Sequence, residues 1–270
     1  MRDLKIKEFQ KIIRDFYGKN KRELPWRNTR DPYKILVSEI MLQQTQVSRV
    51  LLKYPEFIKA FPTLLSLAKA PFSDVLRVWQ GLGYNRRAKA IKNASGAIWR
   101  LYKGKIPRDI DSLLKLPGIG PSTAGGILAF AYNIPYPFIE TNIRRIFIHH
   151  FFPRKKNVHD REILQLVEKT MDVQNPREWY YALFDYGTYL GKQVKNPNRR
   201  SKHYTKQKAF AGSHRQIRGL VLKKILGEGS MSKERLRAEI KGTEKQFERV
   251  LGELIKEKFI TKHRGLYKTT

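Results

Sequence analysis

The stretch Leu116-Pro117-Gly118-Ile119-Gly120-Pro121-Ser122-Thr123-Ala124-Gly125 decides how the rest of the sequence is interpreted. Apolar periodicity predicts a helix over residues 109–115 before this turn and another over 121–132 after it. Glycine adopts backbone angles that other residues avoid, so Gly118 and Gly120 allow a tight connection between the two helices. The backbone N–H groups at the start of the second helix can then face an anion.

The sequence Leu-Pro-Gly-Ile-Gly is typical of a helix–hairpin–helix motif, placed here near residues 109–132. Such a motif grips one DNA phosphate without reading the base sequence. Gly118, Gly120 and Thr123 are therefore the predicted phosphate-binding residues. The alternative is a plain helix connection, because Gly-x-Gly turns are common.

The charge of the chain favours the phosphate-binding interpretation. The 270 residues include 55 Lys and Arg against 24 Asp and Glu, which gives a formal net charge of +31. A field of this sign attracts polyanions, so nucleic acid or an acidic membrane surface is the expected partner. No stretch approaches the roughly 18 apolar residues of a membrane span. The first residues lack the apolar core of a signal peptide, so we expect a DNA-associated intracellular protein without a membrane partner.

Cysteine is absent from the sequence. This excludes disulfides, thiolate catalysis, and zinc or iron–sulfur sites held by cysteine. The six histidines have no metal-ligand spacing, and the adjacent His149 and His150 point to different helix faces. We therefore expect neither a metal site nor an iron–sulfur cluster.

Helical patterns dominate until the last dozen residues, which predicts an all-α fold. The predicted helices cover residues 4–17, 32–54, 62–69, 72–80, 86–102, 109–115, 121–132, 141–150, 158–171 and 177–190. A helical domain over 1–194 follows from them. The segment 195–213 is strongly basic, and it is predicted to be a linker or a segment that faces phosphate, a solvated loop being the alternative.

A winged-helix-like domain is predicted over residues 214–270, with helices at 214–226, 232–240 and 243–258 and a terminal hairpin. Thr243 and Gln246 form a capping box, and one apolar stripe of the third helix contains Phe247, Val250, Leu251, Leu254 and Ile255. Winged helices enter the DNA major groove, mediate protein contacts or cap a larger enzyme. The sequence leaves these three alternatives open.

Two glutamates stand out as candidates for chemistry. Glu39 shares one helix face with Ile35, Leu36 and Leu42, and burial there raises the pKa of a carboxyl and suits it to deliver a proton. The alternative is a glutamate that reaches solvent or pairs with an arginine. Glu140 lies at a loop-to-helix junction, where it or Thr141 can simply cap the helix. Together, two carboxyl groups can serve as acid and charge stabiliser in cleaving a glycosidic bond.

Four segments now carry a family resemblance: Leu24-Pro25-Trp26-Arg27, Val37-Ser38-Glu39-Ile40-Met41-Leu42-Gln43-Gln44-Thr45-Gln46-Val47, Gly81-Leu82-Gly83-Tyr84 and the hairpin. In this order, over roughly residues 20–190, they resemble the adenine DNA glycosylases of the MutY type, in the helix–hairpin–helix glycosylase superfamily. The resemblance implies removal of adenine mispaired with 8-oxoguanine or guanine, after the adenine is flipped out of the duplex. It implies mismatched or damaged double-stranded DNA as the partner, and we expect a monomer.

The resemblance also assigns roles to single residues. Glu39 matches the catalytic glutamate that protonates the departing adenine at N7, and Asn142 matches a second polar residue of the site. Trp26 and Arg27 match residues at the rim of the adenine pocket. Other family residues wedge into the base stack or touch the opposite purine, and these are matched by Gln44, Thr45, Leu82 and Tyr84. The alternatives are core packing for Trp26 and Leu82, an ion pair for Arg27 and a half-buried surface ring for Tyr84.

The sequence departs from the family at several places. Glu140 stands where the family has an aspartate that stabilises the oxocarbenium ion, so the same electrostatic role needs a longer side chain to reach the sugar. The four cluster-binding cysteines expected after Asp185-Tyr186-Gly187 are missing, and the winged helix replaces the usual C-terminal domain. Ser122 holds the position of the nucleophilic lysine in bifunctional relatives, so no Schiff base forms.

These features predict a monofunctional glycosylase in which Glu39 is the general acid and Glu140 stabilises the cation. Asn142 and Ser122 order water and sugar. One alternative is the same fold with altered base choice, namely thymine or uracil opposite guanine, or hypoxanthine. Pyrimidines have no N7 to protonate, so Glu39 favours a purine. The other alternative is a non-catalytic DNA-binding protein.

Overall fold

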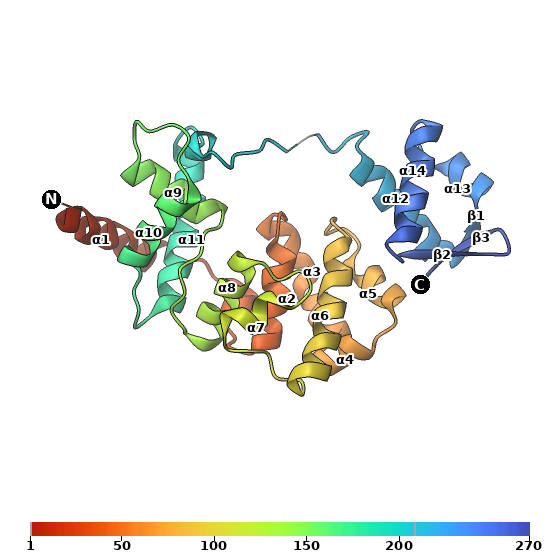
Figure 1. Cartoon of the computed structure of the whole chain (residues 1–270), viewed down its shortest axis with the longest axis horizontal. Helices are drawn as coiled ribbons and strands as arrows, with labels where there is room; N and C mark the ends of the chain where they lie inside the picture. Colours follow the sequence, from red (N-terminus) through yellow and green to blue (C-terminus); the bar gives the residue numbers. More distant parts are fainter. Residues whose placement is uncertain (1, 208) are drawn as a thin grey trace. The chain divides into compact units, whose positions relative to one another are not determined.

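The computed structural model describes residues 2–207 and 209–270. Most of these residues are helical, and the one small sheet described lies near the C-terminus, which confirms the predicted fold class (Figure 1). The elements are α1 (Arg2–Asn20), η1 (Pro25–Arg27), α2 (Pro32–Leu42), α3 (Val47–Ala60), α4 (Leu64–Lys69), α5 (Phe72–Trp79), α6 (Arg86–Tyr102), α7 (Ile110–Leu114), α8 (Pro121–Tyr132), α9 (Thr141–Phe151), α10 (Asp160–Thr170), α11 (Pro176–Gln193), η2 (Pro197–Arg200), α12 (His214–Glu228), β1 (Ser230–Ser232), α13 (Lys233–Glu239), α14 (Glu244–Lys256), β2 (Ile260–His263) and β3 (Leu266–Thr269).

Contacts divide the chain into two compact units. Unit 1 contains Met1–Ile40 and Ile106–Lys206, and unit 2 contains Met41–Lys105 and Gln207–Thr270. Each unit therefore combines segments that are distant in sequence. This division does not follow the boundaries expected at residues 194 and 214, which remain predictions about which parts fold independently.

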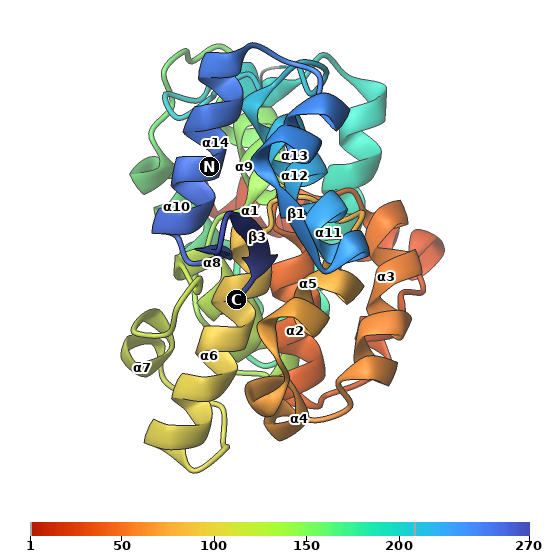
Figure 2. The same cartoon turned by 90° about the vertical axis from the view of Figure 1, so that its right-hand side faces the viewer.

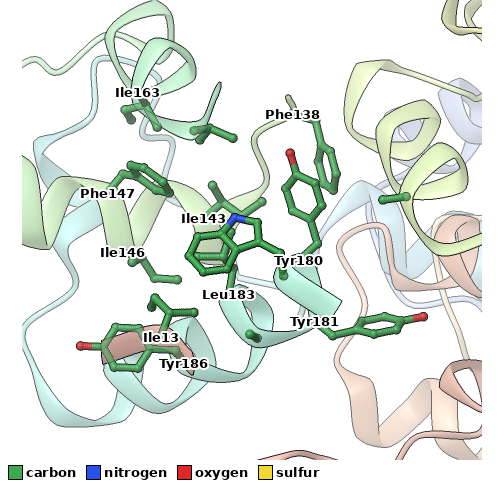
Figure 3. Close-up of a cluster of buried hydrophobic side chains, with 14 of the residues drawn as sticks. Ile13, Phe138, Ile143, Ile146, Phe147, Ile163, Tyr180, Tyr181, Leu183 and Tyr186 are labelled. Carbon is green, nitrogen blue, oxygen red and sulfur yellow. The ribbon is translucent and has the colours of Figure 1, made fainter. Parts of the chain in front are cut away.

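The core of unit 1 is formed where α1, α9, α10 and α11 pack together. Figure 3 shows Ile13 of α1, Ile143 and Phe147 of α9, and Leu183 of α11 converging on one cluster. These side chains are fully buried, and each such burial contributes roughly 1.5–3 kcal/mol. The core thus fixes α9, the helix that begins next to Glu140.

One predicted helix is wrong. The sequence predicts a single helix over residues 32–54, but α2 ends at Leu42 and α3 begins at Val47. Gln44 lies in the left-handed region with a φ of 54°, and the Arg87 guanidinium donates to the carbonyl oxygens of Met41 and Gln43 at 2.7 and 2.6 Å. A side-chain donor thus satisfies carbonyls at the end of α2, where the helical hydrogen bonds stop.

The basic segment 195–213 is not simply a solvated loop. Residues 197–200 form η2, and the side chain of Asn196 accepts a hydrogen bond from the Asn198 N–H. Val158 forms a parallel bridge with Ser201, donating to the Arg200 carbonyl and accepting from the Lys202 N–H. The first part of the segment is therefore packed within unit 1.

The C-terminal module has the winged-helix arrangement that the sequence predicts. Its strands form an antiparallel sheet in the order β1-β3-β2, and α12, α13 and α14 lie beside it (Figure 2). The strand β1 was not predicted, because it has only three residues. Thr243 and Gln246 form the expected capping box. Ile255, however, is exposed rather than part of the buried stripe.

No helix of the described residues is long and apolar enough to cross a membrane.

Candidate active site

Glu39 sits in an apolar setting, as its place in the sequence predicts. Leu36 and Ile40, on the same helix α2, are fully buried. A Cβ atom on Gly126 of α8 would lie only 2.4 Å from Glu39 Oε2, so the missing side chain makes room for the carboxyl group. Burial, followed by the charge of Glu140, raises the pKa of Glu39 from 4.5 to about 8. Glu39 is therefore largely protonated at neutral pH.

Glu140 lies in a different electrostatic setting. It is the N-cap of α9, and its Oε1 accepts a hydrogen bond of 2.7 Å from the Ile143 N–H. Burial raises the pKa of Glu140, while N–H donors of Asn142 and Ile143 and the charges of Arg145 and Arg144 act in the opposite direction. These donors and charges stabilise the carboxylate form. Glu140 is a helix cap, as one alternative proposed, and its charge also acts on Glu39.

Asn142 is fixed between Glu140 and α11. Its Nδ2 donates to Glu140 Oε2 at 3.3 Å, and its Oδ1 accepts from Arg145 Nη1 at 2.8 Å. The same Arg145 nitrogen donates to the Gly187 carbonyl at 2.6 Å. A Cβ atom on Gly187 would lie 2.6 Å from the Asn142 Cβ atom. The glycine therefore allows α9 and α11 to approach each other at this site.

The predicted pocket residues Trp26 and Arg27 both lie in η1, where Trp26 is buried and the Arg27 side chain is 5% exposed. Arg27 donates two hydrogen bonds of 2.8 Å to the carboxylate of Asp185 in α11, and its guanidinium stacks over the Tyr181 ring at 4.4 Å. Arg22 also pairs with Asp185. Burial acts to raise the pKa of Asp185, but these arginines outweigh it and lower the pKa. The structure thus shows the ion pair named as the alternative for Arg27, and contact with adenine remains a prediction.

The hairpin connects α7 and α8 as the sequence predicts. Gly118 has a φ of 76°, which favours glycine, whereas Gly120 is the extended N-cap of α8 with a φ of −95°. A Cβ atom on Gly120 would have no heavy atom of the described protein within 4 Å. The backbone conformation at Gly120 therefore does not need a glycine, and the missing side chain leaves open space in front of the start of α8. Ser122 and Thr123 lie in the first turn of α8, and their roles remain predictions.

The wedge residues predicted by resemblance lie on two loops of unit 2. Arg87 joins these loops: besides the Gln43 carbonyl, its guanidinium donates to Thr45 Oγ1 at 2.8 Å and to the carbonyls of Leu82 and Gly83 at 3.2 and 3.1 Å. Burial lowers the pKa of Arg87 to about 10, so it stays charged at neutral pH. One buried cation therefore holds both loops together.

The four wedge residues differ in exposure. Gln44 is exposed, Thr45 and Tyr84 are half-buried, and Leu82 is 2% exposed. Leu82 thus has the core position named as its alternative, and insertion into a base stack would require it to move. Gln44 and Tyr84 both lie in the left-handed region, with φ of 54° and 49°, a strained conformation that is often found at functional sites.

Sequence reasoning missed four features of these sites: Asp185, Arg87, Arg145 and the glycines that face Glu39 and Asn142. Asp185 was noted only as a landmark before the missing cysteines. The local sequence gives no signal for these features, because each depends on a contact with a residue distant in sequence. Arg27 and Asp185, for example, are 158 positions apart. Within the described residues, no group of three or more acidic or histidine side chains could hold a metal ion.

A family profile described as "HhH-GPD superfamily base excision DNA repair protein" matches residues 37–171, which include Glu39, the hairpin and Glu140. The chain belongs to this superfamily. The match confirms the family resemblance found in the sequence and agrees with the helical fold.

Known relatives are similar to about two thirds of the chain. An adenine DNA glycosylase of Buchnera aphidicola subsp. Baizongia pistaciae (strain Bp) is 36% identical over 186 residues, which are 67% of this chain and 52% of that protein. The chain spans about half the length of the adenine DNA glycosylases that it matches. A thymine/uracil-DNA glycosylase of Methanothermobacter thermautotrophicus is 27% identical over 189 residues, 69% of this chain and 86% of that protein.

Among solved structures, a thermostable thymine-DNA glycosylase superposes with a TM-score of 0.64 at 26% identity, over 69% of this chain and 87% of that one. This likeness covers about the same share of the chain as the matches to glycosylase sequences. The glycosylase fold is therefore shared by proteins that differ in the base named in their descriptions.

Proposed function

We propose that this protein is a monofunctional DNA glycosylase that hydrolyses the N-glycosidic bond of adenine opposite 8-oxoguanine or guanine in double-stranded DNA. The observation that carries the proposal is the contrast between Glu39 and Glu140. Two interacting carboxyl groups in different environments divide the roles of acid and anion. Similarity to adenine DNA glycosylases at 36% identity supports the choice of base.

Glu39 is the general acid in this proposal. Burial and the charge of Glu140 keep its proton at neutral pH, and a protonated carboxyl can donate to N7 of adenine as the base departs. Protonation makes adenine a neutral leaving group. Room for the carboxyl comes from Gly126.

Glu140 stabilises the positive sugar that forms as the bond breaks. The Ile143 N–H and the two neighbouring arginines favour its carboxylate form, and a fixed anion near a developing cation lowers the barrier. Asn142, tied to Glu140 and Arg145, orients this carboxylate. Water then adds to the sugar and leaves an abasic site.

Ser122 limits the reaction to hydrolysis. It replaces the amine nucleophile of bifunctional enzymes, and a hydroxyl forms no Schiff base. The hairpin around Gly118 and Gly120 holds a phosphate beside the lesion. The net charge of +31 supports capture of duplex DNA.

Base choice is the part to test first, because the relatives include a thymine/uracil-DNA glycosylase. The experiment incubates the protein with duplexes that carry adenine, thymine, uracil or hypoxanthine opposite guanine or 8-oxoguanine, and measures released base by chromatography. The proposal expects adenine release with an intact abasic strand. Release of thymine or uracil alone would favour the alternative base choice, and no release from any duplex would favour a non-catalytic DNA-binding protein.

A further inference from the structure

The winged-helix module presents a helix that is poorly suited to read DNA. α14 is the third helix of the module, the place of a recognition helix, yet it contains three acidic and three basic residues. Its glutamates pair with cations of the module, as in Lys233–Glu248, Arg237–Glu244 and Arg249–Glu253. A phosphate-binding helix needs a positive surface. The surface of α14 therefore lacks the excess of positive charge that groove binding needs.

The end of α14 is instead docked on α6, within unit 2. The Glu257 carboxylate forms ion pairs with Arg86 of α6 at 2.6 Å and with Arg218 of α12 at 2.7 Å. The Phe259 ring, which is buried, packs edge-on against Phe72 of α5 with 5.3 Å between centroids. Lys89 of α6 donates to the Glu257 carbonyl. Ion pairs and aromatic packing together fix the module to the start of α6.

The same module reaches the side chain of Tyr84, two residues before α6. Arg215 Nη1 of α12 lies 2.6 Å from the Tyr84 hydroxyl, and the Arg215 guanidinium lies 5.5 Å from the centre of its ring. Gln207, just before the module, also donates to this hydroxyl. Arg87 lies 5.4 Å from the ring centre. Tyr84 is thus held by cations from two parts of unit 2.

We propose that the winged-helix module positions Tyr84 through Arg215, so that it sets the preference for the base opposite the adenine rather than reading a DNA groove. The inference rests on the proposed function, together with the family resemblance by which Tyr84 matches residues that wedge into the base stack or touch the opposite purine. A ring that stacks in a duplex gains most when its orientation is fixed beforehand. Arg215 is a positioning residue, because it acts on the DNA through Tyr84.

The test compares Arg215→Ala, Tyr84→Phe and the double variant with the wild-type protein. Arg249→Ala is the matched control, since Arg249 lies in the same module, is largely exposed and pairs only locally with Glu253 among the interactions described. Single-turnover excision is measured with adenine opposite 8-oxoguanine and opposite guanine. Thermal unfolding shows whether each variant remains folded.

We expect Arg215→Ala to reduce the ratio of the two rates about tenfold, the size of one lost charged hydrogen bond. Tyr84→Phe should reduce it similarly, and the double variant should show less than the sum of the two losses, because both changes remove the hydrogen bond between Arg215 and the Tyr84 hydroxyl. Arg249→Ala should keep the wild-type ratio. An unchanged ratio in Arg215→Ala, or additive losses in the double variant, would overturn the proposal. Equal loss of excision on the two duplexes leaves the ratio unchanged and would point to groove or phosphate contact instead.

The proposed function and this inference fail in different ways. If wild-type protein releases no base, the proposed function is wrong. The inference is then tested by binding alone. The affinity of each variant is measured for duplexes that carry a stable abasic analogue opposite guanine or opposite 8-oxoguanine, and the ratio of the two affinities replaces the ratio of the two rates. Coupling of Arg215 and Tyr84 in that affinity ratio supports the inference, and its absence overturns it.

Discussion

At the scale of single residues, two glutamates of similar burial are driven toward different roles by their neighbours. Burial raises the pKa of both groups; the charge of Glu140 raises that of Glu39 further, whereas backbone donors and arginine charges partly offset the effect of burial on Glu140. Like charges in one site resist joint ionisation. The proton of the pair therefore resides on Glu39, which is where the proposed reaction needs it.

The pH dependence of excision follows from the pKa of Glu39. A general acid works only when it is protonated, so activity should hold near neutral pH and fall as the pH rises through about 8. Single-turnover rates between pH 6 and 10 measure this. A rate that keeps rising beyond pH 9 would contradict the assignment of Glu39 as the acid.

Gly126 should be as sensitive as the glutamate that it accommodates. The Cβ atom of Gly126→Ala would lie 2.4 Å from Glu39 Oε2, so the carboxyl must move and excision should fall by about 10²-fold or more. Gly252→Ala is the control, because no described heavy atom lies within 4 Å of its Cβ position. It should keep full activity and gain up to about 1 kcal/mol in free energy of unfolding. Equal rates for both variants would remove Gly126 from the site.

The sequence predicts residues of the site unevenly. Glu39 is visible because its helix face is otherwise apolar. Asp185 is not, because its partners Arg22 and Arg27 are more than 150 positions away and nothing local distinguishes it from a solvent-facing acid. Leu82 is predicted by resemblance to enter the base stack, yet it is buried here. The direction of the Leu82 side chain depends on packing against other parts of the fold, which the local sequence does not reveal.

At the scale of elements, most helices follow from periodicity and caps, and the exceptions come from distant contacts. The helices α6 and α8 have the predicted bounds. The sequence does not predict the break between α2 and α3, because the polar residues 43–46 include no glycine or proline. The carbonyls at the break are bound by Arg87, more than 40 positions away. Arg87 follows Arg86 in the first turn of α6, and nothing in the local sequence indicates the carbonyls that it binds.

The segment 196–202 holds both ends of α9, and it occupies the region where the cluster-binding cysteines are missing. Asn198 donates to the Thr141 carbonyl at the start of α9, at 3.1 Å. Arg200 donates to the carbonyls of Ile148 and Phe152 at its end. Ordinary hydrogen bonds therefore position the helix that follows Glu140.

We expect the purified protein to show no visible absorption from a cluster and to keep its melting temperature and activity in chelator. Asn198→Ala, by contrast, should lower the free energy of unfolding by about 1 kcal/mol, because the buried Asn198 side chain loses its hydrogen bond to the Thr141 carbonyl. Urea denaturation measures this change, with the exposed Asn20→Ala as control. Loss of fold or activity in chelator would refute the prediction.

At the scale of the whole molecule, the excess of positive charge controls DNA binding. Neutralised phosphates release counterions, so affinity should fall steeply and linearly on a log–log plot against salt. Lys115→Gln, beside the hairpin, should reduce the slope by about 1. Lys245→Gln, on the charge-balanced α14, should leave it unchanged. Equilibrium binding to one duplex at several salt concentrations measures both slopes, and equal slopes would remove the hairpin from the DNA interface.

The most direct test of the account is the single-turnover rate of adenine release opposite 8-oxoguanine by Glu39→Gln, Glu140→Gln and Glu140→Asp. General acid catalysis contributes about 10²–10⁴ in rate, so Glu39→Gln should nearly abolish release while duplex affinity stays unchanged. Glu140→Gln should also cripple release, and Glu140→Asp should retain or increase it, because the carboxylate remains. Wild-type release by Glu140→Gln would reduce Glu140 to a helix cap, and wild-type release by Glu39→Gln would contradict the mechanism as a whole.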